Sequence, residues 1–545
     1  MRPVVTNPPA TPSTGLQLLA LATLALASRA TILRNGFAFD DFPLLVQNPL
    51  LTSWGNVPEI LGSHLWRTLT TGAVNYYRPV LSLAYLAVAQ LLGVQAWAFH
   101  LFSVLVHVGA TLLVFRVARV VLAHPRAATL SRPERRVLPL VVAALFAVHP
   151  THTEAVAWAC AVQEPMVLVG MLLSTLFFLR ARRGEPGRVA ASTAALVVAL
   201  GTKELALVTP ALLFGCAWLL RGPSTFRHWA PRLVPHLVVV AGYLGLRVSV
   251  LGEVAPLRRF ADLDGLQVAL SGAWHLVSYL GKTLIPVGLR YPYVFHPVLH
   301  VTEWRALVAV LVTVLVTALA WRVRRSHPVV TLGLAWTVVA LAPVLYVPVL
   351  GEAAFADRYV YVPSFGLLLA VCVGAPSLRG VLGTRVLVGF ALGVVLVFTV
   401  HSVQRGRLWR EEVRVTLDAA AREPDPAVAH TARASELIRM NKLDDARLHV
   451  DAALATNPTF APAHHNLGVI HAQRGDVERA ADELLQALLL DPGMVEPHVV
   501  LARIHRQVGN VEEATRHEQD AERLRQERAA SASSGVRPAH RPDVP

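Results

Sequence analysis

The sequence predicts an all-α protein in two parts: a polytopic membrane helical bundle of about eleven spans, and a C-terminal solenoid of helical repeats. Of the 545 residues, 54% are hydrophobic and only 16% are charged, and the mean hydropathy is +0.48, whereas a soluble chain carries about 25% charged residues. Apolar runs recur through the first 402 residues, and a 34-residue period follows them. A string of soluble domains, which the length alone would suggest, is therefore excluded.

The charged residues are divided unevenly between the two parts. Residues 403–545 hold 41 of the 86 charged residues, 22 acidic and 19 basic, so this part has a net charge of −3 and the first 402 residues have +17. Arginine supplies the basic excess, with 47 Arg against 3 Lys, and lies in short loops between apolar runs. This placement is typical of the cytoplasmic loops of membrane proteins. We therefore interpret the high pI as a topology signal and expect no nucleic-acid partner.

The first apolar run, residues 15–33, follows a Pro-rich leader. It resembles a secretory signal, but because many spans follow it, we interpret it as an uncleaved first helix. Crossing a bilayer takes about 20 apolar residues, and the ten further candidate runs are 97–122, 137–149, 162–180, 188–203, 205–221, 234–251, 304–322, 328–347, 359–374 and 383–402. Two shorter or interrupted segments, 79–92 and 266–285, are predicted to be interfacial or re-entrant helices.

The charges between these runs predict which loops share a side of the membrane. With eleven spans and a start inside, one side receives all the Arg clusters, which are Arg116 to Arg136, Arg180 to Arg188, Arg221 to Arg232, Arg322 to Arg325, and Arg379. Of the 14 acidic residues before residue 403, only Glu134 and Glu185 fall in inside loops. An odd number of spans places the polar tail outside. The Arg-rich, Lys-poor composition and the short loops suggest a high-GC bacterium, so we expect the membrane to be a bacterial plasma membrane.

The tail has an internal period of 34 residues. Three sets of residues recur at this spacing, namely Pro424, Pro458 and Pro492; Asn441, Gly475 and Gly509; and Ala446, Ala480 and Ala514. Thirty-four residues is the length of a tetratricopeptide repeat, in which two antiparallel helices meet at small residues. We therefore predict a membrane domain over residues 1–402, about three tetratricopeptide repeats over 403–528, and a disordered Ser/Pro/Arg-rich tail over 529–545.

Two adjacent carboxylates, Asp40 and Asp41, follow the first span on the outer side. They are either a solvated helix end or the source of a general base that removes a proton from an acceptor hydroxyl. Tyr77 and Arg78 open the first interfacial segment, where aromatic and cationic residues often serve only as anchors at the membrane surface. From the residues alone, both interpretations of each pair stay open.

A dense polar turn separates two later spans. It contains His149, His152 and Glu154, and Glu164 follows one short helix later. These residue types suit a metal, but their spacing matches no compact zinc motif, so a hydrogen-bonded pocket for a sugar or phosphate is favoured and a divalent metal is not expected. The cysteines lie in or beside apolar runs and offer neither a zinc ligand set nor a disulfide framework; they are Cys160, Cys216 and Cys372.

Further polar residues are predicted to lie at outer helix ends. Lys203 stands beside Glu204, and a later stretch contains Asp357, Arg358 and Tyr359. Lys203 is one of two lysines before residue 403. A cation close to the membrane usually has a function or a partner, and Glu204 is the partner that a simple ion pair would need.

In this order, the motifs resemble those of the TMTC-type O-mannosyltransferase-like proteins, of the GT-C superfamily of polytopic glycosyltransferases. The resemblance covers about residues 15–525, and its most specific part is the run from His149 to Ala157, His-Pro-Thr-His-Thr-Glu-Ala-Val-Ala. One departure follows this run. Relatives commonly carry Gly-Arg-x-Glu-Leu where residues 161–165 read Ala-Val-Gln-Glu-Pro, so Glu164 is retained and the arginine is not.

The resemblance implies a GT-C-like fold and the transfer of a mannose-like sugar from a polyprenyl or dolichyl phosphate to a hydroxyl acceptor on the outer face. The candidate catalytic residues are Asp40, Asp41 and Glu154, and the candidate substrate-binding residues are Tyr77, Arg78, His149, His152, Glu164, Lys203, Glu204, Asp357, Arg358 and Tyr359. One base, with cations at the leaving phosphate, would give direct displacement with inversion. The repeats would present a protein or peptide acceptor. The alternatives are a non-catalytic membrane-anchored repeat scaffold and a transporter.

Overall fold

The computed structural model describes residues 13–68, 74–127, 130–181, 185–222, 225–255, 263–293, 295–350, 354–375, 384–423 and 425–533. Every regular element in these ranges is a helix, as the predicted all-α class requires. The chain divides into two compact units, Met1–Glu412 and Val413–Pro545, which we call the membrane unit and the repeat unit. We expected the division after residue 402. It falls later because the last helix of the bundle continues to Leu408.

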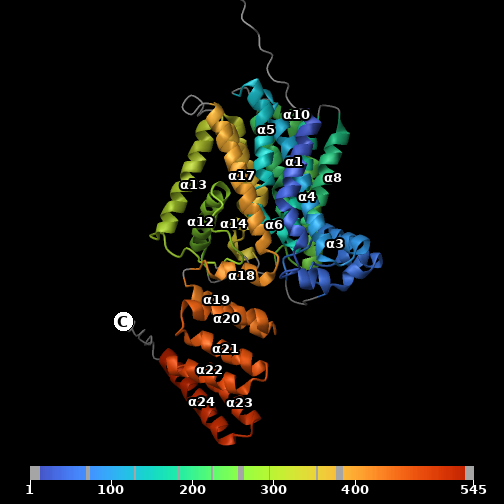
Figure 1. Cartoon of the computed structure of the whole chain (residues 1–545). Coiled ribbons are helices and arrows are strands. Elements are labelled where there is room, and N and C mark those ends of the chain that lie inside the picture. The colour runs from blue at the N-terminus through green and yellow to red at the C-terminus, as the bar shows by residue number, and fades with distance from the viewer. Residues whose placement is uncertain are drawn as a thin grey trace, which may run out of the picture. The chain divides into compact units, whose positions relative to one another are not determined.

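The membrane unit is a bundle of helices (Figure 1). Its α-helices are α1 (Thr14–Arg29), α2 (Val57–Gly62), α3 (Pro79–Leu92), α4 (Ala96–Leu122), α5 (Arg132–Ala147), α6 (Thr153–Ala157), α7 (Gln163–Arg180), α8 (Pro186–Thr202), α9 (Thr209–Arg221), α10 (Phe226–Trp229), α11 (Val234–Leu251), α12 (Gly265–Leu284), α13 (Trp304–Val323), α14 (Pro328–Leu345), α15 (Tyr361–Gly374) and α17 (Thr384–Leu408). Five short helical turns contain or adjoin many of the polar residues of interest, namely η1 (Ala30–Arg34), η6 (Pro150–His152), η7 (Ala159–Val162), η8 (Glu204–Val208) and η12 (Asp357–Val360).

Eight helical segments in the described ranges are long and apolar enough to cross a membrane, and α5 with α6 makes a ninth if this pair, bent by 48°, is one span. This criterion accounts for nine of the eleven predicted spans. The other two, at 188–203 and 359–374, are α8 and α15, with 17 and 14 residues. Each is bounded at one end by a polar break, since α8 ends before Lys203 and α15 begins after η12.

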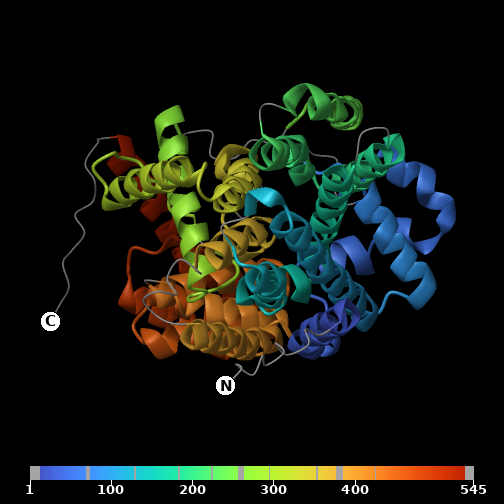
Figure 2. The same ribbon diagram turned by 90° about the horizontal axis from the view of Figure 1, so that it is seen from above.

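The helices of the bundle differ in how much of their surface faces outward. In η7 and α7, 67% of the most apolar window is buried inside the chain, against 11% for α13 and 6% for α17. Seen from above, the helices pack as a cluster and not as a single row (Figure 2). Exposing apolar surface to water costs about 25 cal/mol per Å², so helices as exposed and apolar as α13 and α17 require lipid around them. The segment η7–α7 is central.

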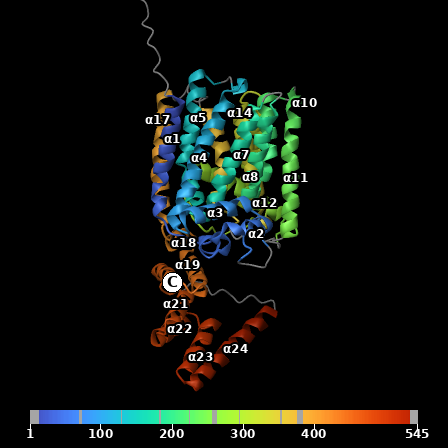
Figure 3. The same ribbon diagram turned by 90° about the vertical axis from the view of Figure 1, so that its right-hand side faces the viewer.

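The first predicted interfacial segment is α3, which lies across the end of the bundle, near α2, in Figure 3. It has 14 residues, too few to cross a bilayer. α3 packs against the end of α8, where a Cβ added at Gly201 would collide with Val80. The second predicted interfacial segment is α12, a 20-residue helix that does not meet the criterion for a span. Both helices border the polar breaks.

α15 is held against α14 by the close approach of two glycines. A Cβ added at Gly333 would collide with the carbonyl oxygen of Gly366, and a Cβ at Gly366 with that of Gly333. Small residues let membrane helices pack with their backbones close together, since lipid supplies no hydrophobic drive for helix association. η12 immediately precedes α15, so this contact fixes the position of η12 and its side chains.

The repeat unit consists of α18 (Glu412–Ala420) and three helix pairs, which are α19 (Pro426–Arg439) with α20 (Leu443–Thr456), α21 (Ala461–Gln473) with α22 (Val477–Leu490), and α23 (Val495–Gln507) with α24 (Val511–Ser533). The periodic alanines Ala446, Ala480 and Ala514 are fully buried. Asn441, Gly475 and Gly509 join the helices of each pair with φ of 58°, 81° and 81°, a left-handed conformation that Gly and Asn adopt most easily. The predicted repeats are confirmed.

A few expectations concern residues that the structure does not describe. Pro424, Arg379 and residues 534–545 lie outside the described ranges. The tail that we expected from residue 529 begins inside a helix, because α24 continues to Ser533.

Candidate active site

The loop after α1 gives its two carboxylates different surroundings. Asp41 is fully buried, and its two oxygens accept hydrogen bonds from the backbone N–H of Cys160 at 2.8 Å and of Ala38 at 3.0 Å. Burial raises the pKa of Asp41 to about 7, against the lowering effect of these hydrogen bonds. Asp40 is half-buried. Asp41 therefore ties the loop to η7, and Asp40 is the more exposed carboxylate of the pair.

An aromatic cluster lies next to Asp40. Phe39 has φ of 51°, an unusual conformation for a non-glycine residue, and its ring contacts Trp158, Tyr291 and Trp409 with centroid distances of 5.7, 5.0 and 6.1 Å. The indole N–H of Trp158 donates to the carbonyl of Ala38 at 3.1 Å. The four rings form a rigid apolar wall beside the carboxylate. We call these residues the aromatic cluster.

The guanidinium of Arg358 faces this cluster. Its central carbon lies 5.0 Å from the ring centroid of Trp158 and 5.5 Å from that of Tyr291. Glu154 forms an ion pair with the guanidinium and also accepts the backbone N–H of Arg358 at 3.3 Å. Both residues are almost completely buried. Glu154 is thus the anchor that holds this cation in place.

Tyr291 connects the loop of Asp40 to the buried ion pair. Its ring contacts Phe39, the neighbour of Asp40, and the guanidinium of Arg358. Burial raises the pKa of the Tyr291 hydroxyl, Arg358 acts to lower it, and Asp40 and Glu154 act to raise it further. The sequence predicted all three charged residues, and the structure pairs Glu154 with Arg358, 204 residues later.

Two further ion pairs continue the polar network. Lys203 pairs with Glu164, and Arg78 pairs with Glu204 through Nη2–Oε1 at 2.5 Å and Nε–Oε2 at 3.0 Å. The ring of Tyr359 joins them to the first pair, since the Lys203 ammonium lies 5.1 Å and the Arg358 guanidinium 4.9 Å from its centroid. Each cation has one carboxylate, so the three pairs are neutral together.

Val162 stands where relatives carry the family arginine, and the next residue, Gln163, contacts a cation of the site. The side-chain oxygen of Gln163 accepts a hydrogen bond from Nη1 of Arg78. Val162 itself is a buried apolar residue, so the position of the arginine supplies no cation, and Gln163 beside it supplies an acceptor. The positive charge at this place in the site comes from Arg78, on the neighbouring segment before α3.

Asp357 belongs to a separate group of contacts. One carboxylate oxygen accepts a hydrogen bond from the hydroxyl of Tyr293 at 2.7 Å, and the other lies 3.8 Å from the guanidinium of Arg405. Burial raises the pKa of Asp357, while Arg405 and Lys282 act to lower it. Asp357 thus links η12 to α17 and to the segment after α12. It positions its neighbour Arg358 and is not grouped with the three cations.

His149 and His152, which we expected to bind substrate, are fully buried structural residues. His149 contacts the carbonyl of Thr283 at 2.9 Å and the hydroxyl of Thr151 at 2.7 Å. His152 contacts the carbonyl of Phe146 and the hydroxyl of Ser364, both at 2.9 Å. Because all four ring nitrogens are bonded within the protein, neither residue is arranged to hold a ligand or a metal.

Arg29, which sequence reasoning missed, explains why this polar turn is so well ordered. Its guanidinium is fully buried and donates to the hydroxyl of Thr153 and the carbonyl of His149, both at 2.8 Å. The end of α1 therefore clamps the turn that leads into Glu154. The signal in the sequence was an arginine at the end of the first apolar run, which is not one of the Arg clusters in the predicted inside loops.

Tyr77 likewise has a packing role. Its hydroxyl donates to the carbonyl of Leu61 at 2.9 Å, and its ring stacks on Tyr243 with a centroid distance of 6.2 Å. The adjacent Tyr76 is the ring that faces the charges, because Arg78 lies 4.6 Å from its centroid. The aromatic residues of the site that the sequence did not single out are Trp158, Tyr291 and Trp409.

The comparisons with known proteins agree with these motifs. The chain is similar to "Protein O-mannosyl-transferase Tmtc2" of Drosophila melanogaster, 32% identical over 217 residues that make up 38% of this chain and 22% of the relative. A Protein O-mannosyl-transferase of Caenorhabditis elegans is 23% identical over 490 residues, 87% of this chain and 63% of the relative. The chain resembles the TMTC-type O-mannosyl-transferases. It spans less than two thirds of the length of these relatives.

Two further matches were found, one to a family model within the repeat unit and one to a solved structure of low sequence identity. Residues 431–497 match the family model described as Tetratricopeptide repeat, which places the repeats of the TMTC-like chain where α19 to α23 lie. Among solved structures, ArnT from Cupriavidus metallidurans bound to undecaprenyl phosphate aligns over 89% of this chain and 81% of ArnT, with a TM-score of 0.38 and 14% identity.

Proposed function

We propose that the chain is a membrane glycosyltransferase of the GT-C type, which moves a mannose-like sugar from a polyprenyl or dolichyl phosphate to a hydroxyl acceptor on the extracytoplasmic face. The observation that carries the proposal is the buried Glu154–Arg358 ion pair, whose guanidinium lies over the rings of Trp158 and Tyr291. The same two rings contact Phe39, the neighbour of Asp40. An accessible carboxylate beside a fixed guanidinium supplies a base and a cation, the two groups that such a transfer needs.

In this proposal Asp40 removes the proton from the acceptor hydroxyl. The acceptor oxygen forms a bond to the anomeric carbon as the bond from that carbon to the phosphate oxygen breaks, and the lipid phosphate leaves with the electron pair. A single displacement of this kind inverts the anomeric carbon. Asp41 keeps the loop of Asp40 in place through its two backbone hydrogen bonds.

The departing phosphate would be met by Arg358, Lys203 and Arg78. These cations are held at fixed positions by Glu154, Glu164 and Glu204, so they need little reorganisation when charge develops on the leaving group. The short apolar helix α3 begins directly after Arg78 and offers an apolar wall for the isoprenoid chain. No metal is required in this scheme.

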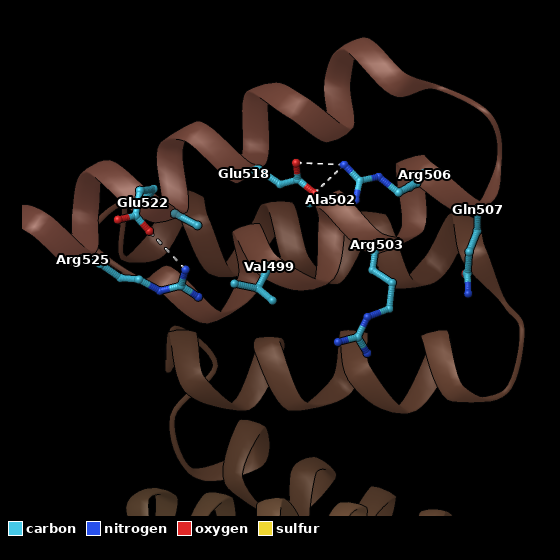
Figure 4. Close-up of a pocket in the computed structure, with 9 residues that line it drawn as sticks. Val499, Ala502, Arg503, Arg506, Gln507, Glu518, Glu522 and Arg525 are labelled. Atoms are coloured by element: carbon cyan, nitrogen blue, oxygen red, sulfur yellow. Dashed lines mark hydrogen bonds and ion pairs between the residues drawn. The ribbon is translucent and has the colours of Figure 1, made fainter.

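The repeat unit is proposed to recruit a protein or peptide acceptor. A cavity of about 570 Å³ lies on α23 and α24, within the usual size range of ligand pockets, about 300–1,000 Å³. Figure 4 shows Arg503 and Arg506 on one of its helices and Glu518 and Glu522 on the other. A lining of mixed charge suits a polar peptide.

The decisive experiment compares Asp40→Asn with the unaltered protein in membranes supplied with labelled polyprenyl-phosphate mannose. Loss of the base should lower transfer by about 10²- to 10⁴-fold with no change in protein abundance. Glu59→Gln, an exposed carboxylate in α2, is the matched control and should retain full transfer. Unchanged transfer in Asp40→Asn would contradict the proposal, and no transfer by the unaltered protein with any lipid-phosphate sugar would favour the scaffold alternative.

A further inference from the structure

Each pair of helices in the repeat unit carries a facing pair of side chains at equivalent positions. The first helix carries a histidine, and the second carries a histidine or glutamate 19 residues later, giving His430 with His449, His464 with Glu483, and His498 with His517. The contacts are Nδ1 to Nδ1 at 3.1 Å in the first pair, Nδ1 to carboxylate at 2.7 Å in the second, and Nδ1 to Nδ1 at 2.9 Å in the third.

The first two pairs are complete within the protein. His430 and His449 are buried, and the second nitrogen of His449 contacts the hydroxyl of Thr416 at 2.9 Å. His464 has Glu483 on one nitrogen and the carbonyl of Pro458 on the other, at 3.0 Å. Both pairs are accounted for by packing and hydrogen bonding.

The third pair differs, because a carboxylate joins it at a partly exposed position. His498, His517 and Asp520 each offer one ligating atom, and these atoms lie within 4.8 Å of one another. His517 and Asp520 are three residues apart on α24, one turn of the helix, and His498 faces them from α23. Among the described residues, this is the group of His, Cys, Asp or Glu atoms close enough to share an ion.

We propose that His498, His517 and Asp520 bind a divalent transition-metal ion, with Zn²⁺ as the best fit. Two imidazole nitrogens and one carboxylate oxygen are ligands that Zn²⁺ prefers, and three protein ligands leave a fourth position for water. Nitrogens bound to one tetrahedral Zn²⁺ at about 2.0–2.1 Å lie about 3.4 Å apart. The two Nδ1 atoms, at 2.9 Å, reach that separation by small rotations of the rings.

The charges around the site bear on its affinity. Two Nδ1 atoms in contact must share one proton, which an ion would replace. The ring of His505 lies parallel to that of His517, with a centroid distance of 5.5 Å, and limits its rotation. Arg523 pairs with one oxygen of Asp520 at 2.8 Å, so it competes with the ion for this carboxylate. The bound ion would link α23 to α24 and stabilise this helix pair.

The test uses the full chain, purified in detergent without a histidine tag and stripped with a chelator. Titration with Co²⁺ should give visible d–d absorption, and Zn²⁺ should displace it at one ion per chain. His498→Gln and His517→Gln should each weaken binding by about 100-fold, and Asp520→Asn by about 10-fold, amounts typical of losing a metal ligand or its support. Arg523→Gln should strengthen it. His464→Gln, the equivalent position in the second pair, is the matched control and should bind normally.

Hydrogen exchange gives an independent readout. Zn²⁺ should slow exchange of amides in α23 and α24 in the unaltered protein, and have no effect on these helices in His517→Gln. Circular dichroism checks that each variant keeps its helix content, and Asp520→Asn, an isosteric change on a half-exposed residue, remains informative if a histidine variant unfolds. Absence of saturable binding, or binding that Asp520→Asn and His498→Gln both leave unchanged, would overturn the proposal.

Discussion

Replacing Asp41 by Asn should destabilise the membrane unit at acidic pH, whereas replacing the adjacent Asp40 should remove transfer without a loss of stability. Both oxygens of Asp41 accept backbone N–H groups in a fully buried place. A neutral carboxyl can still accept both, but an Asn side chain presents an NH₂ group to one of them. One buried N–H, of Ala38 or Cys160, is then left without an acceptor, at a cost of about 1–3 kcal/mol.

The size of this effect should depend on pH. Burial raises the pKa of Asp41 from 3.8 to about 7, so folding favours the protonated carboxyl. A carboxyl with a raised pKa in the folded state stabilises the fold most below a pH of about 4, and this contribution is lost as the pH rises to about 7. At about 1.4 kcal/mol per pH unit, the loss amounts to at most about 4 kcal/mol. Asn does not titrate. The free energy of unfolding of the unaltered protein should therefore exceed that of Asp41→Asn by about 1–3 kcal/mol at pH 4, and this difference should shrink toward pH 7 and can reverse in sign.

The assay is the thermal unfolding midpoint of both proteins in detergent, followed by circular dichroism from pH 4 to pH 8. Asp40→Asn, measured in parallel, controls for the loss of a carboxylate from the same loop and should show no narrowing. A gap that widens as the pH rises would refute the reasoning, because it would mean that the two N–H donors keep Asp41 ionised in the folded protein and outweigh burial.

Two other predictions follow from the same structure. Arg358→Gln should abolish transfer and lower the free energy of unfolding by about 3–5 kcal/mol, since it leaves Glu154 buried without its partner. Arg358→Lys keeps the charge and should retain most of the stability, measured by thermal unfolding. An equal loss of stability in both variants would show that the charge of Arg358 is not what Glu154 requires. A reporter fused after Pro545 should behave as exported, because the arginine-rich loops place the tail outside, and a cytoplasmic reporter would contradict the predicted sidedness.

The features that the sequence predicted well depend on local chemistry. Runs of apolar residues identify segments that need lipid, and α13 and α17 are the clearest cases because little of their surface is buried in the chain. The 34-residue period identified the repeats because Asn441, Gly475 and Gly509 each occupy a left-handed turn, a requirement that each residue meets by itself. The polar residues near the site were also found, because charge beside a membrane is rare.

The roles of those polar residues were harder to predict, because they depend on segments far apart in the chain. Nothing in the adjacent pair Asp40 and Asp41 indicates that Asp41 accepts a hydrogen bond from the backbone of Cys160, 119 residues away. Nor does it indicate that Asp41 is buried and Asp40 only partly so. His149 and His152 have the residue types of a ligand set, but their nitrogens are already bonded to other helices.

The sequence by itself determined the two parts of the chain, the membrane character of the first, the repeats of the second, and the set of charged residues from which a site is drawn. Only the tertiary structure decided which members of that set face one another, such as Glu154 and Arg358, 204 residues apart. It also decided which members, such as His149 and His152, are buried and hydrogen-bonded within the fold. The physical reason is that hydropathy and backbone conformation are properties of neighbouring residues, whereas burial, ion pairing and free hydrogen-bonding capacity arise when distant segments meet.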